Sequence, residues 1–249
     1  MPMNTHSQKI RNFRHKSQEG TVRGVRVIYG DRASVDLIAQ SQMDFIYLDQ
    51  QHGTITTRDI YEITAMVVPY DLVVLVRTPD NGATSIGLAL DAGAHGVLAP
   101  EIESVTQARE LVASTRFPPA GARSWGGFAA GQSGYSSQKD FVDPICWALI
   151  ESKSALDEVE KIVQVEGVDG IYVGRFDLAL SMSISPDNIA TDTLLNAQIH
   201  TILQQANAAG LPAGTSGDFS TLADQGFRIL TVRSELELLS VGLQKYLKD

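Results

Sequence analysis

The feature that most constrains the fold of this chain is a regular alternation of two patterns along its 249 residues. Short apolar runs without helical periodicity alternate with segments whose apolar residues recur every three or four positions. The runs are GVRVIYG, DFIYLD, LVVLVR, HGVLAP, ICWALIES, GIYVG, LPAG and FRILTV. Eight such strand–helix units in about 250 residues predict an α/β fold, a single-domain (β/α)8 TIM barrel. An open doubly wound sheet is the alternative, but it would need fewer strands and usually a glycine-rich first turn.

Two segments fall outside the alternation. We expect residues 1–23 to form a short helix that covers the bottom of a barrel built from residues 24–249, with a frayed arm as the alternative. The connection at residues 116–143, between the fourth helix and the fifth strand, is too long for an ordinary barrel loop and is rich in Gly and Ser. It carries three aromatic residues, Trp125, Phe128 and Tyr135. Long structured loops of this kind are usually lids or interface elements, so we expect a functional or oligomeric role.

Composition argues against several classes of partner. The chain has 20 Lys and Arg against 29 Asp and Glu, so no nucleic-acid partner is expected, although strand-end arginines still allow small anionic substrates. Its single cysteine, Cys146, cannot form an internal disulfide, which fits a reducing compartment. No apolar run approaches the roughly 20 residues needed to cross a bilayer, and the first residues lack the apolar core of a secretory signal. We therefore expect no membrane association and a cytoplasmic location.

Two of the predicted strands end in a carboxylate. ICWALIES closes on Glu151 and GIYVGRFDL closes on Asp177, with one helical segment, Ser154 to Val165, between them. A strand–helix–strand unit makes the two strands parallel, so both carboxylates lie at the same edge of the sheet. Such a pair suits Mg²⁺ or Mn²⁺, which prefer oxygen ligands and leave several positions to water and substrate. The alternative from spacing alone is that both acids cap the following helices.

Other polar residues also follow the predicted strands, at the end of a barrel where catalysis takes place. They are Asp49, Gln51, His52, Arg77, Glu101, Arg175 and Arg233. A lone histidine after a strand is most often a solvated loop residue. His52, however, would face the same mouth as two carboxylates and an arginine, which makes it a candidate general base.

Other catalytic signatures are weak or absent. The sequence contains no GxxxxGK[ST] phosphate loop, no GxSxG elbow and no strand-linked GxGxxG. The segment GTSGD, at residues 214–218, would suit a phosphate at a helix N-terminus, with an ordinary helix cap as the alternative. A Schiff-base aldolase needs a desolvated lysine, and the best candidate, Lys153, is expected to be solvated at the start of a helix.

Six segments together resemble the HpcH/HpaI family. They are FIYLDQQHG, VVLVRTP, LDAGAHGVLAPEIES, ARELVASTRFPPAGARSWG, ALIES and VEGVDGIYVGRFDLALSM, which follow one another over nearly the whole chain. The family comprises metal-dependent class II pyruvate aldolases (hydroxy-oxo-heptanedioate and ketodeoxy sugar acid aldolases), which are distantly related to citrate lyase beta chains. The resemblance implies a (β/α)8 barrel and a homo-oligomer, from dimer to hexamer, in which the last helix is exchanged between subunits.

The resemblance also implies roles for particular residues. Glu151 and Asp177 match the ligands of a divalent metal, which would be Mg²⁺, Mn²⁺ or Co²⁺. His52 matches the catalytic base and Asp91 the acid that raises the basicity of that histidine. Arg77 matches the arginine that stabilises the developing enolate oxygen.

The implied substrates are a small 2-oxo acid and an aldehyde. The residues implied in substrate binding are Arg77 and the turn Gly174, Arg175, Phe176 and Asp177, in which the N–H groups of the last two receive the pyruvate carboxylate. The implied reaction cleaves a 4-hydroxy-2-oxo acid to pyruvate, or a related 2-oxo acid, and an aldehyde, or runs in reverse. Alternatives are a metal-dependent 2-oxo acid decarboxylase or acyl-CoA lyase of the same superfamily and, from another class, a non-catalytic ligand-binding barrel.

The sequence departs from the family pattern in four places. Leu149 stands where glutamine is usual, Gln51 where glutamate is usual, Gly174-Arg175-Phe176-Asp177 for Gly-Pro-Ala-Asp, and Val232-Arg233-Ser234-Glu235 for Val-Gly-Ser-Asp. The metal ligands and the base survive these changes, while the substrate pocket does not. We therefore hypothesise retained chemistry on a different, more anionic or larger acceptor. The alternatives are drift without a change of substrate, and loss of aldol activity with residual decarboxylation.

Overall fold

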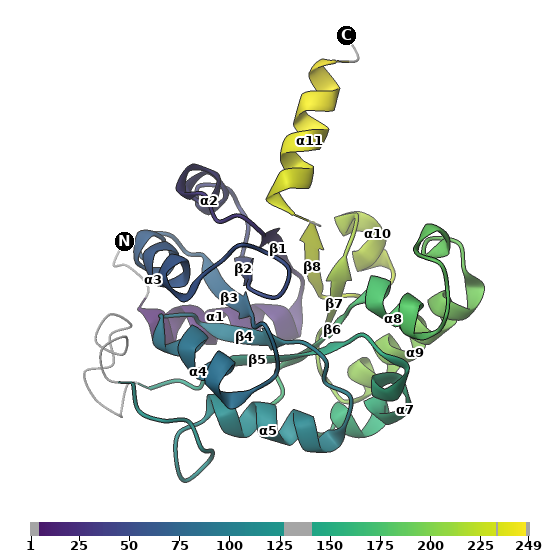
Figure 1. Ribbon diagram of the computed structural model, residues 1–249, viewed down its shortest axis with the longest axis horizontal. Helices are drawn as coiled ribbons and strands as arrows, with labels where there is room; N and C mark the ends of the chain where they lie inside the picture. Colours follow the sequence, from purple (N-terminus) through teal and green to yellow (C-terminus); the bar gives the residue numbers. More distant parts are fainter. Residues whose placement is uncertain (1–4, 127–140, 233, 248–249) are drawn as a thin grey trace.

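Eight parallel strands close into a barrel in sequence order in the computed structural model, which describes residues 5–126, 141–232 and 234–247 (Figure 1). The strands are β1 (Val22–Val27), β2 (Phe45–Asp49), β3 (Val73–Arg77), β4 (Gly96–Ala99), β5 (Ile145–Ile150), β6 (Gly170–Val173), β7 (Ala213–Ser216) and β8 (Ile229–Val232). β1 also pairs with β8, which closes the barrel. The predicted (β/α)8 barrel is confirmed. The seventh strand begins two residues later than the LPAG run.

Helices α2 to α10 follow the strands and form the outer layer, while α1 precedes β1 and α11 follows β8 (Figure 1). They are α1 (His6–Glu19), α2 (Arg32–Ala39), α3 (Thr57–Met66), α4 (Ala83–Asp91), α5 (Val105–Thr115), α7 (Lys153–Ile162), α8 (Arg175–Ser181), α9 (Thr193–Ala208), α10 (Phe219–Asp224) and α11 (Glu235–Tyr246), with a 3₁₀ turn η2 (Pro186–Asn188). Side chains at the N-caps fix several starts, such as Thr56, which forms a capping box with Asp59. α8 begins directly after β6, so Asp177 lies in its first turn. No helix of the described residues is long and apolar enough to cross a membrane.

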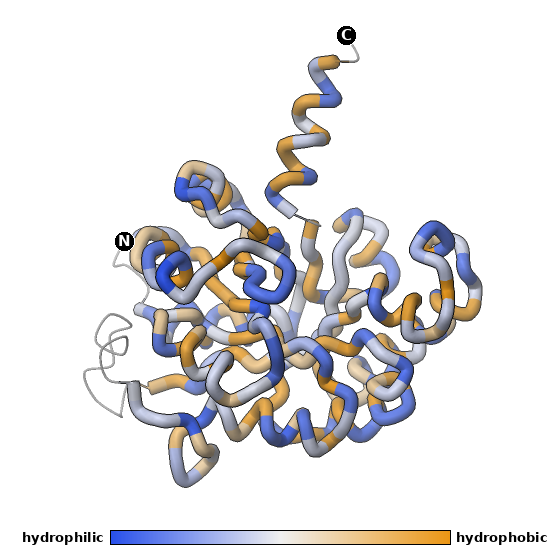
Figure 2. The backbone as a smooth tube through the Cα atoms, in the orientation of Figure 1, coloured by the Kyte–Doolittle hydropathy of each residue, from blue (hydrophilic) through white to orange (hydrophobic). Residues whose placement is uncertain are grey.

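Apolar residues concentrate in the strands, as Figure 2 shows, and fill two regions of the core. One lies between the barrel and the surrounding helices, and the other fills the barrel interior. α1 packs against the interior from below, because the ring of Phe13 lies 5.5 Å from Phe45 and 5.8 Å from Trp147 between ring centroids. The carboxyl ends of the strands therefore form the open mouth. β1 begins at Val22, two residues before the predicted start of the barrel at residue 24. The division of the chain into residues 1–23 and 24–249 stays a prediction.

The long connection begins and ends at the bottom of the barrel. Trp125 contacts Phe117, and Phe117 contacts Phe141, with ring centroids 4.9 and 4.8 Å apart. Arg14 of α1 donates a hydrogen bond to the Pro144 carbonyl at 2.9 Å, which joins the end of this connection to the same face. The two described ends of this connection lie at the opposite end of the barrel from the mouth. A role of the connection at an interface between subunits stays a prediction. Phe128 and Tyr135 lie outside the described residues.

α11 projects away from the barrel (Figure 1). The spacing of Leu236, Leu239, Leu243 and Tyr246 in the sequence predicts one apolar side for this helix. In the structure Leu239, Leu243 and Tyr246 are 61%, 57% and 83% exposed. Among its residues only Glu235 is buried. The carboxylate of Glu235 accepts the N–H groups of Ile28 and Tyr29 at 2.7–3.0 Å, which fixes the start of α11 to the end of β1. Exchange of this helix between subunits stays a prediction.

Candidate active site

Asp49, at the end of β2, contacts side chains and backbone from several segments at the barrel mouth. Its carboxylate is fully buried and accepts hydrogen bonds from Nε and Nη2 of Arg77 at 2.9 and 2.5 Å. It also accepts the backbone N–H groups of Gln51 and His52, both at 3.1 Å. Burial alone would raise the pKa of Asp49, but the hydrogen bonds and charge of Arg77 and the charge of Arg26 hold it below its ordinary value. Asp49 therefore orients the arginine and the segment that carries the histidine.

Arg26, on β1, is a site residue that the sequence analysis missed. Its Nε and Nη2 lie 2.7 and 2.5 Å from Oδ2 of Asp49, on the neighbouring strand. In the sequence, Arg26 interrupts an apolar strand run, and alternation along that run turns it to the same side as Val22 and Gly24. The alternation therefore predicts to which side of the strand Arg26 points. That Arg26 pairs with Asp49 is evident only from the packing of the strands.

Glu151 and Asp177 meet at the neighbouring ends of β5 and β6. Burial raises the pKa of the Glu151 carboxyl to about 7; the charge of Asp177 acts in the same direction, and the N–H of Glu101 and the charge of Arg77 oppose them. Glu151 does not cap α7, because the side chain of Ser152 accepts the capping N–H of Ala155 at 3.1 Å. The helix-cap alternative is therefore wrong for Glu151.

The backbone around Glu151 is built for a close approach. A Cβ on Gly174 would lie 2.7 Å from Cβ and 2.8 Å from Oε2 of Glu151, so only glycine fits there. Glu101 adopts a left-handed conformation, with φ of 56°, that side chains rarely take. This conformation lets its N–H donate to Oε1 of Glu151 at 2.9 Å, while Asn81 holds its carbonyl at 3.0 Å. Glu151 is therefore fixed by backbone geometry on two sides.

His52 and Asp91 lie apart in the chain. His52 is exposed at the mouth, and its imidazole has no hydrogen-bonding partner among the described residues. Asp91 ends α4, and a helix that follows a barrel strand ends at the barrel bottom. There Asp91 pairs with Nη2 of Arg123 at 2.9 Å. The structure does not bring the two residues together within one chain, and the role of Asp91 stays a prediction.

Two alternatives from the sequence are settled by their surroundings. Lys153 is 64% exposed and pairs with Asp157, so it is solvated as expected. In the segment at residues 214–218, Asp218 accepts the N–H of Thr221 at 2.9 Å and caps α10, which confirms the ordinary helix cap. Arg233 lies outside the described residues.

Two cavities meet at the mouth. One, the axial cavity, has a volume of about 290 Å³, and its lining includes Arg26, Arg77, Arg175, Tyr47, Leu149, Tyr172, Gly174 and Phe176. The other, the acidic cavity, has a volume of about 420 Å³, and its lining includes Gln51, Glu101, Glu103, Gln107 and Ser152. His52, Glu151 and Asp177 line both. The candidate metal ligands and base therefore lie where the two cavities join.

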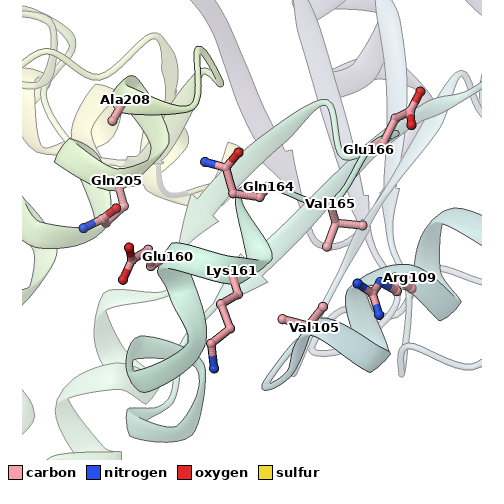
Figure 3. A pocket seen from close by; sticks show the side chains of 9 residues that line it. All are labelled: Val105, Arg109, Glu160, Lys161, Gln164, Val165, Glu166, Gln205 and Ala208. Carbon is pink, nitrogen blue, oxygen red and sulfur yellow. The ribbon is translucent and has the colours of Figure 1, made fainter.

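A further cavity of about 1040 Å³ lies outside the barrel, between α5, α7 and α9 (Figure 3). Its charged side chains include both signs, with Arg109 and Lys161 beside Glu160 and Glu166. None of the residues that the sequence analysis selected lines it. The mouth of the barrel is therefore the better candidate for the active site.

Comparisons with known proteins show the family of the chain. Residues 29–235 match the family described as HpcH/HpaI aldolase/citrate lyase. A 2-keto-3-deoxy-L-rhamnonate aldolase of Escherichia coli K12 is 31% identical over 208 residues, which cover 81% of this chain and 77% of that enzyme. An HpcH/HpaI aldolase/citrate lyase family protein from Burkholderia cenocepacia superposes with a TM-score of 0.87 and 25% identity over 95% of this chain and 98% of that one. The CitE protein of Mycobacterium tuberculosis, solved with magnesium and acetoacetate, shares the fold at a TM-score of 0.59 and 17% identity, over 88% and 87% of the chains.

Proposed function

Because this chain belongs to the HpcH/HpaI aldolase/citrate lyase family, we propose that it is a divalent-metal-dependent carbon–carbon lyase. It would cleave a 4-hydroxy-2-oxo acid to pyruvate, or a related 2-oxo acid, and an aldehyde, or run the reverse condensation. The observation that carries the proposal is the meeting of Glu151 and Asp177 beside His52 and Arg77 at one mouth. A barrel that only binds a ligand has no need for all four.

The two carboxylates fit a hard dication. Glu151 is buried and its pKa is raised to about 7, so two ionised carboxylates at this point are costly without a cation. No group of three or more His, Cys, Asp and Glu able to hold a metal occurs in the described parts of the chain. Two protein carboxylates suit Mg²⁺ or Mn²⁺, which keep several positions for water and substrate. When bound, the ion would supply Lewis-acid polarisation of the 2-oxo group.

The protein residues would divide the remaining work. His52 would take the proton of the 4-hydroxyl, after which the C3–C4 bond breaks and leaves an enolate and an aldehyde. Arg77, held side-on by the buried carboxylate of Asp49, would donate to the enolate oxygen from a fixed position, an effect typically worth about 3 kcal/mol. The N–H groups of Phe176 and Asp177 would receive the substrate carboxylate, as the resemblance implies.

Release of pyruvate from a panel of 4-hydroxy-2-oxo acids tests this function. The assay is run with EDTA and then with Mg²⁺, Mn²⁺ or Co²⁺ restored, for the wild type and for Glu151→Gln and His52→Ala. Glu103→Gln is the matched control, since Glu103 is an exposed acid of the acidic cavity. Metal-dependent release that Glu151→Gln abolishes, His52→Ala strongly reduces and Glu103→Gln retains would support the aldolase. Metal binding without release from any member of the panel would overturn it, and release of CO₂ instead would favour the decarboxylase.

A further inference from the structure

The carboxylate of Glu151 is surrounded by segments from neighbouring strand ends. β3, β4, β5 and β6 are consecutive in the barrel, so the segments that follow them lie side by side at the mouth. These segments carry Asn81 after β3, Glu101 after β4, Glu151 after β5 and Gly174 after β6. Asn81 and Glu101 take no part in the proposed chemistry, yet a chain of two hydrogen bonds joins them to Glu151. That chain is the basis of the inference.

Glu101 adopts a backbone conformation that needs support from its neighbours. Its φ of 56° is left-handed, which is unfavourable for a residue with a side chain because Cβ crowds the following carbonyl. Hydrogen bonds hold it at both ends of the residue. Its N–H donates to Oε1 of Glu151 at 2.9 Å, and its carbonyl accepts Nδ2 of the half-buried Asn81 at 3.0 Å. Asn81 therefore stabilises the conformation in which the Glu101 N–H points at Glu151.

The hydrogen bond from Glu101 makes the two oxygens of Glu151 unequal. Oε1 accepts the N–H of Glu101. Oε2 lies 2.8 Å from the position that a Cβ on Gly174 would take, so it faces the start of α8, the helix that carries Asp177 in its first turn. A carboxylate held in this way offers one oxygen to a cation at Asp177 and keeps the other on the backbone.

We propose that Asn81 is a positioning residue that, through Glu101, holds Glu151 to bind a dication with one oxygen and thereby favours Mg²⁺ and Mn²⁺ over Ca²⁺. The proposal rests on the metal-ligand role of Glu151 in the proposed lyase. Mg²⁺ demands near-ideal octahedral geometry and keeps several waters, whereas Ca²⁺ takes six to eight oxygen ligands and accepts both oxygens of one carboxylate. Release of Oε1 from the backbone would therefore harm the binding of Mg²⁺ and Mn²⁺ more than that of Ca²⁺.

The test is binding of Mn²⁺ and of Ca²⁺ to the metal-free protein, measured by calorimetry and, for Mn²⁺, also by electron paramagnetic resonance. We expect Asn81→Ala to weaken Mn²⁺ binding by about 10- to 100-fold, as is typical for groups that orient a metal ligand. Ca²⁺ binding should weaken less, so the preference for Mn²⁺ over Ca²⁺ should fall. Asp80→Ala is the matched control, because the exposed Asp80 lies in the same connection and accepts the N–H of Gly82 at 2.8 Å. It should leave the preference unchanged, since its charge acts alike on both dications.

Two substitutions of Glu101 test whether Asn81 acts through the backbone of that residue. Glu101→Gly and Glu101→Gln remove the same carboxylate, but only glycine adopts the left-handed conformation without cost. Combined with Asn81→Ala, Glu101→Gly should therefore bind Mn²⁺ more tightly than Glu101→Gln. With Asn81 intact, the two should differ less. Where Asn81→Ala does not fold, Asn81→Asp takes its place, because aspartate keeps the shape and lacks the amide donor.

Affinities for Mn²⁺ and Ca²⁺ that fall alike in Asn81→Ala would indicate a merely structural role and overturn the proposal. Unchanged affinities would overturn it too, as would equal Mn²⁺ binding by the two Glu101 variants in the Asn81→Ala background. Glu151→Gln separates this proposal from the lyase. Mn²⁺ binding that Glu151→Gln abolishes and Asn81→Ala leaves unchanged refutes the role of Asn81 alone. Mn²⁺ binding that is absent from the wild type, or that Glu151→Gln leaves unchanged, refutes the metal site on which the lyase depends.

Discussion

Replacing Asp49 by Asn tests whether one buried carboxylate holds the mouth together. Asparagine keeps the shape and one acceptor oxygen, so the contacts from Gln51 and His52 to Oδ1 are retained. At Oδ2 the new amide donor would face Nη2 of Arg77 and both donors of Arg26. Two guanidiniums would then share no negative charge.

The expected loss is about 3 kcal/mol in the free energy of unfolding, the lower end of the range for a broken buried ion pair. The lower end applies because Arg26, at 24% exposure, can turn its charge toward water, whereas Arg77 at 9% cannot. For a chain of this size that is a fall in Tm of about 6–12 °C. Loss of the Arg77 anchor should also lower kcat for metal-dependent cleavage by about 100-fold.

Urea unfolding of the wild type and Asp49→Asn measures the first effect, with Asp157→Asn as the control. Asp157 pairs with Lys153 on the surface, where both side chains are more than 60% exposed, so its replacement should cost under about 0.5 kcal/mol. Adding Arg26→Gln to Asp49→Asn should recover stability, because one of the two uncompensated charges is removed. A loss below about 1 kcal/mol for Asp49→Asn, or a double variant less stable than the single one, would refute the reasoning.

Two further predictions concern the bottom of the barrel and α11. Burial, with the charges of Lys9 and Arg123, lowers the pKa of His6, which stacks on His95 with ring centroids 4.3 Å apart, to about 4. Between pH 6.5 and 4 the unfolded chain therefore binds a proton at His6 that the folded chain does not bind. As the pH is lowered from 6.5 to 5, the free energy of unfolding should decrease by about 2 kcal/mol because of His6. Glu151, with its raised pKa, makes the folded chain more stable as the pH is lowered, which opposes the effect of His6. The measurement is therefore the difference in the free energy of unfolding in urea between the wild type and His6→Gln at each pH. Equal pH profiles of the two proteins would contradict this prediction. For α11, Leu239→Asp should lower the mass in sedimentation equilibrium to that of a monomer while Ser240→Asp should not, because the apolar side of the helix is expected to pack on another subunit; an unchanged mass would contradict this.

The strands and their polar ends were predictable because each apolar run breaks abruptly where a strand leaves the core. That signal marked Glu151 and Asp177 as candidates, although spacing alone left a helix cap as the alternative for both. The partnership of Arg26 with Asp49 does not, because it depends on which strands are neighbours and on their register, with Arg26 opposite Tyr47. After the sixth strand, periodicity predicts only the long helix that carries Leu195, Ile199 and Ile202, which is α9. It does not predict α8, because α8 starts directly after β6 with no polar spacer.

Periodicity also predicted a property of α11 that it could not interpret. An apolar stripe normally indicates the face that a helix turns to its own core. On α11 the stripe is real, yet Leu239 and Leu243 are more than half exposed in the single chain. The sequence pattern indicates that the apolar side of α11 packs against another surface. It does not indicate whether that surface belongs to the same chain or to a second copy. The same holds for Asp91. Within one chain Asp91, at the end of α4, is separated from His52, and the sequence pattern does not distinguish a contact within one chain from a contact with a second copy.

The departure at Leu149 ties the specificity of the mouth to its charge. Leu149 is 2% exposed and lines the axial cavity at a position where the resembled family usually has a glutamine. An apolar side chain there removes a neutral hydrogen-bonding group from the floor of the cavity, while Arg26 and Arg175 add positive charge to its wall. Recognition of the substrate would then depend on charge more than on neutral hydrogen bonds, and charge-based recognition at a partly open mouth is weakened by salt. The same substitutions leave the proposed metal ligands and the proposed base unchanged, and they would make the proposed lyase more selective for anionic substrates and more sensitive to ionic strength.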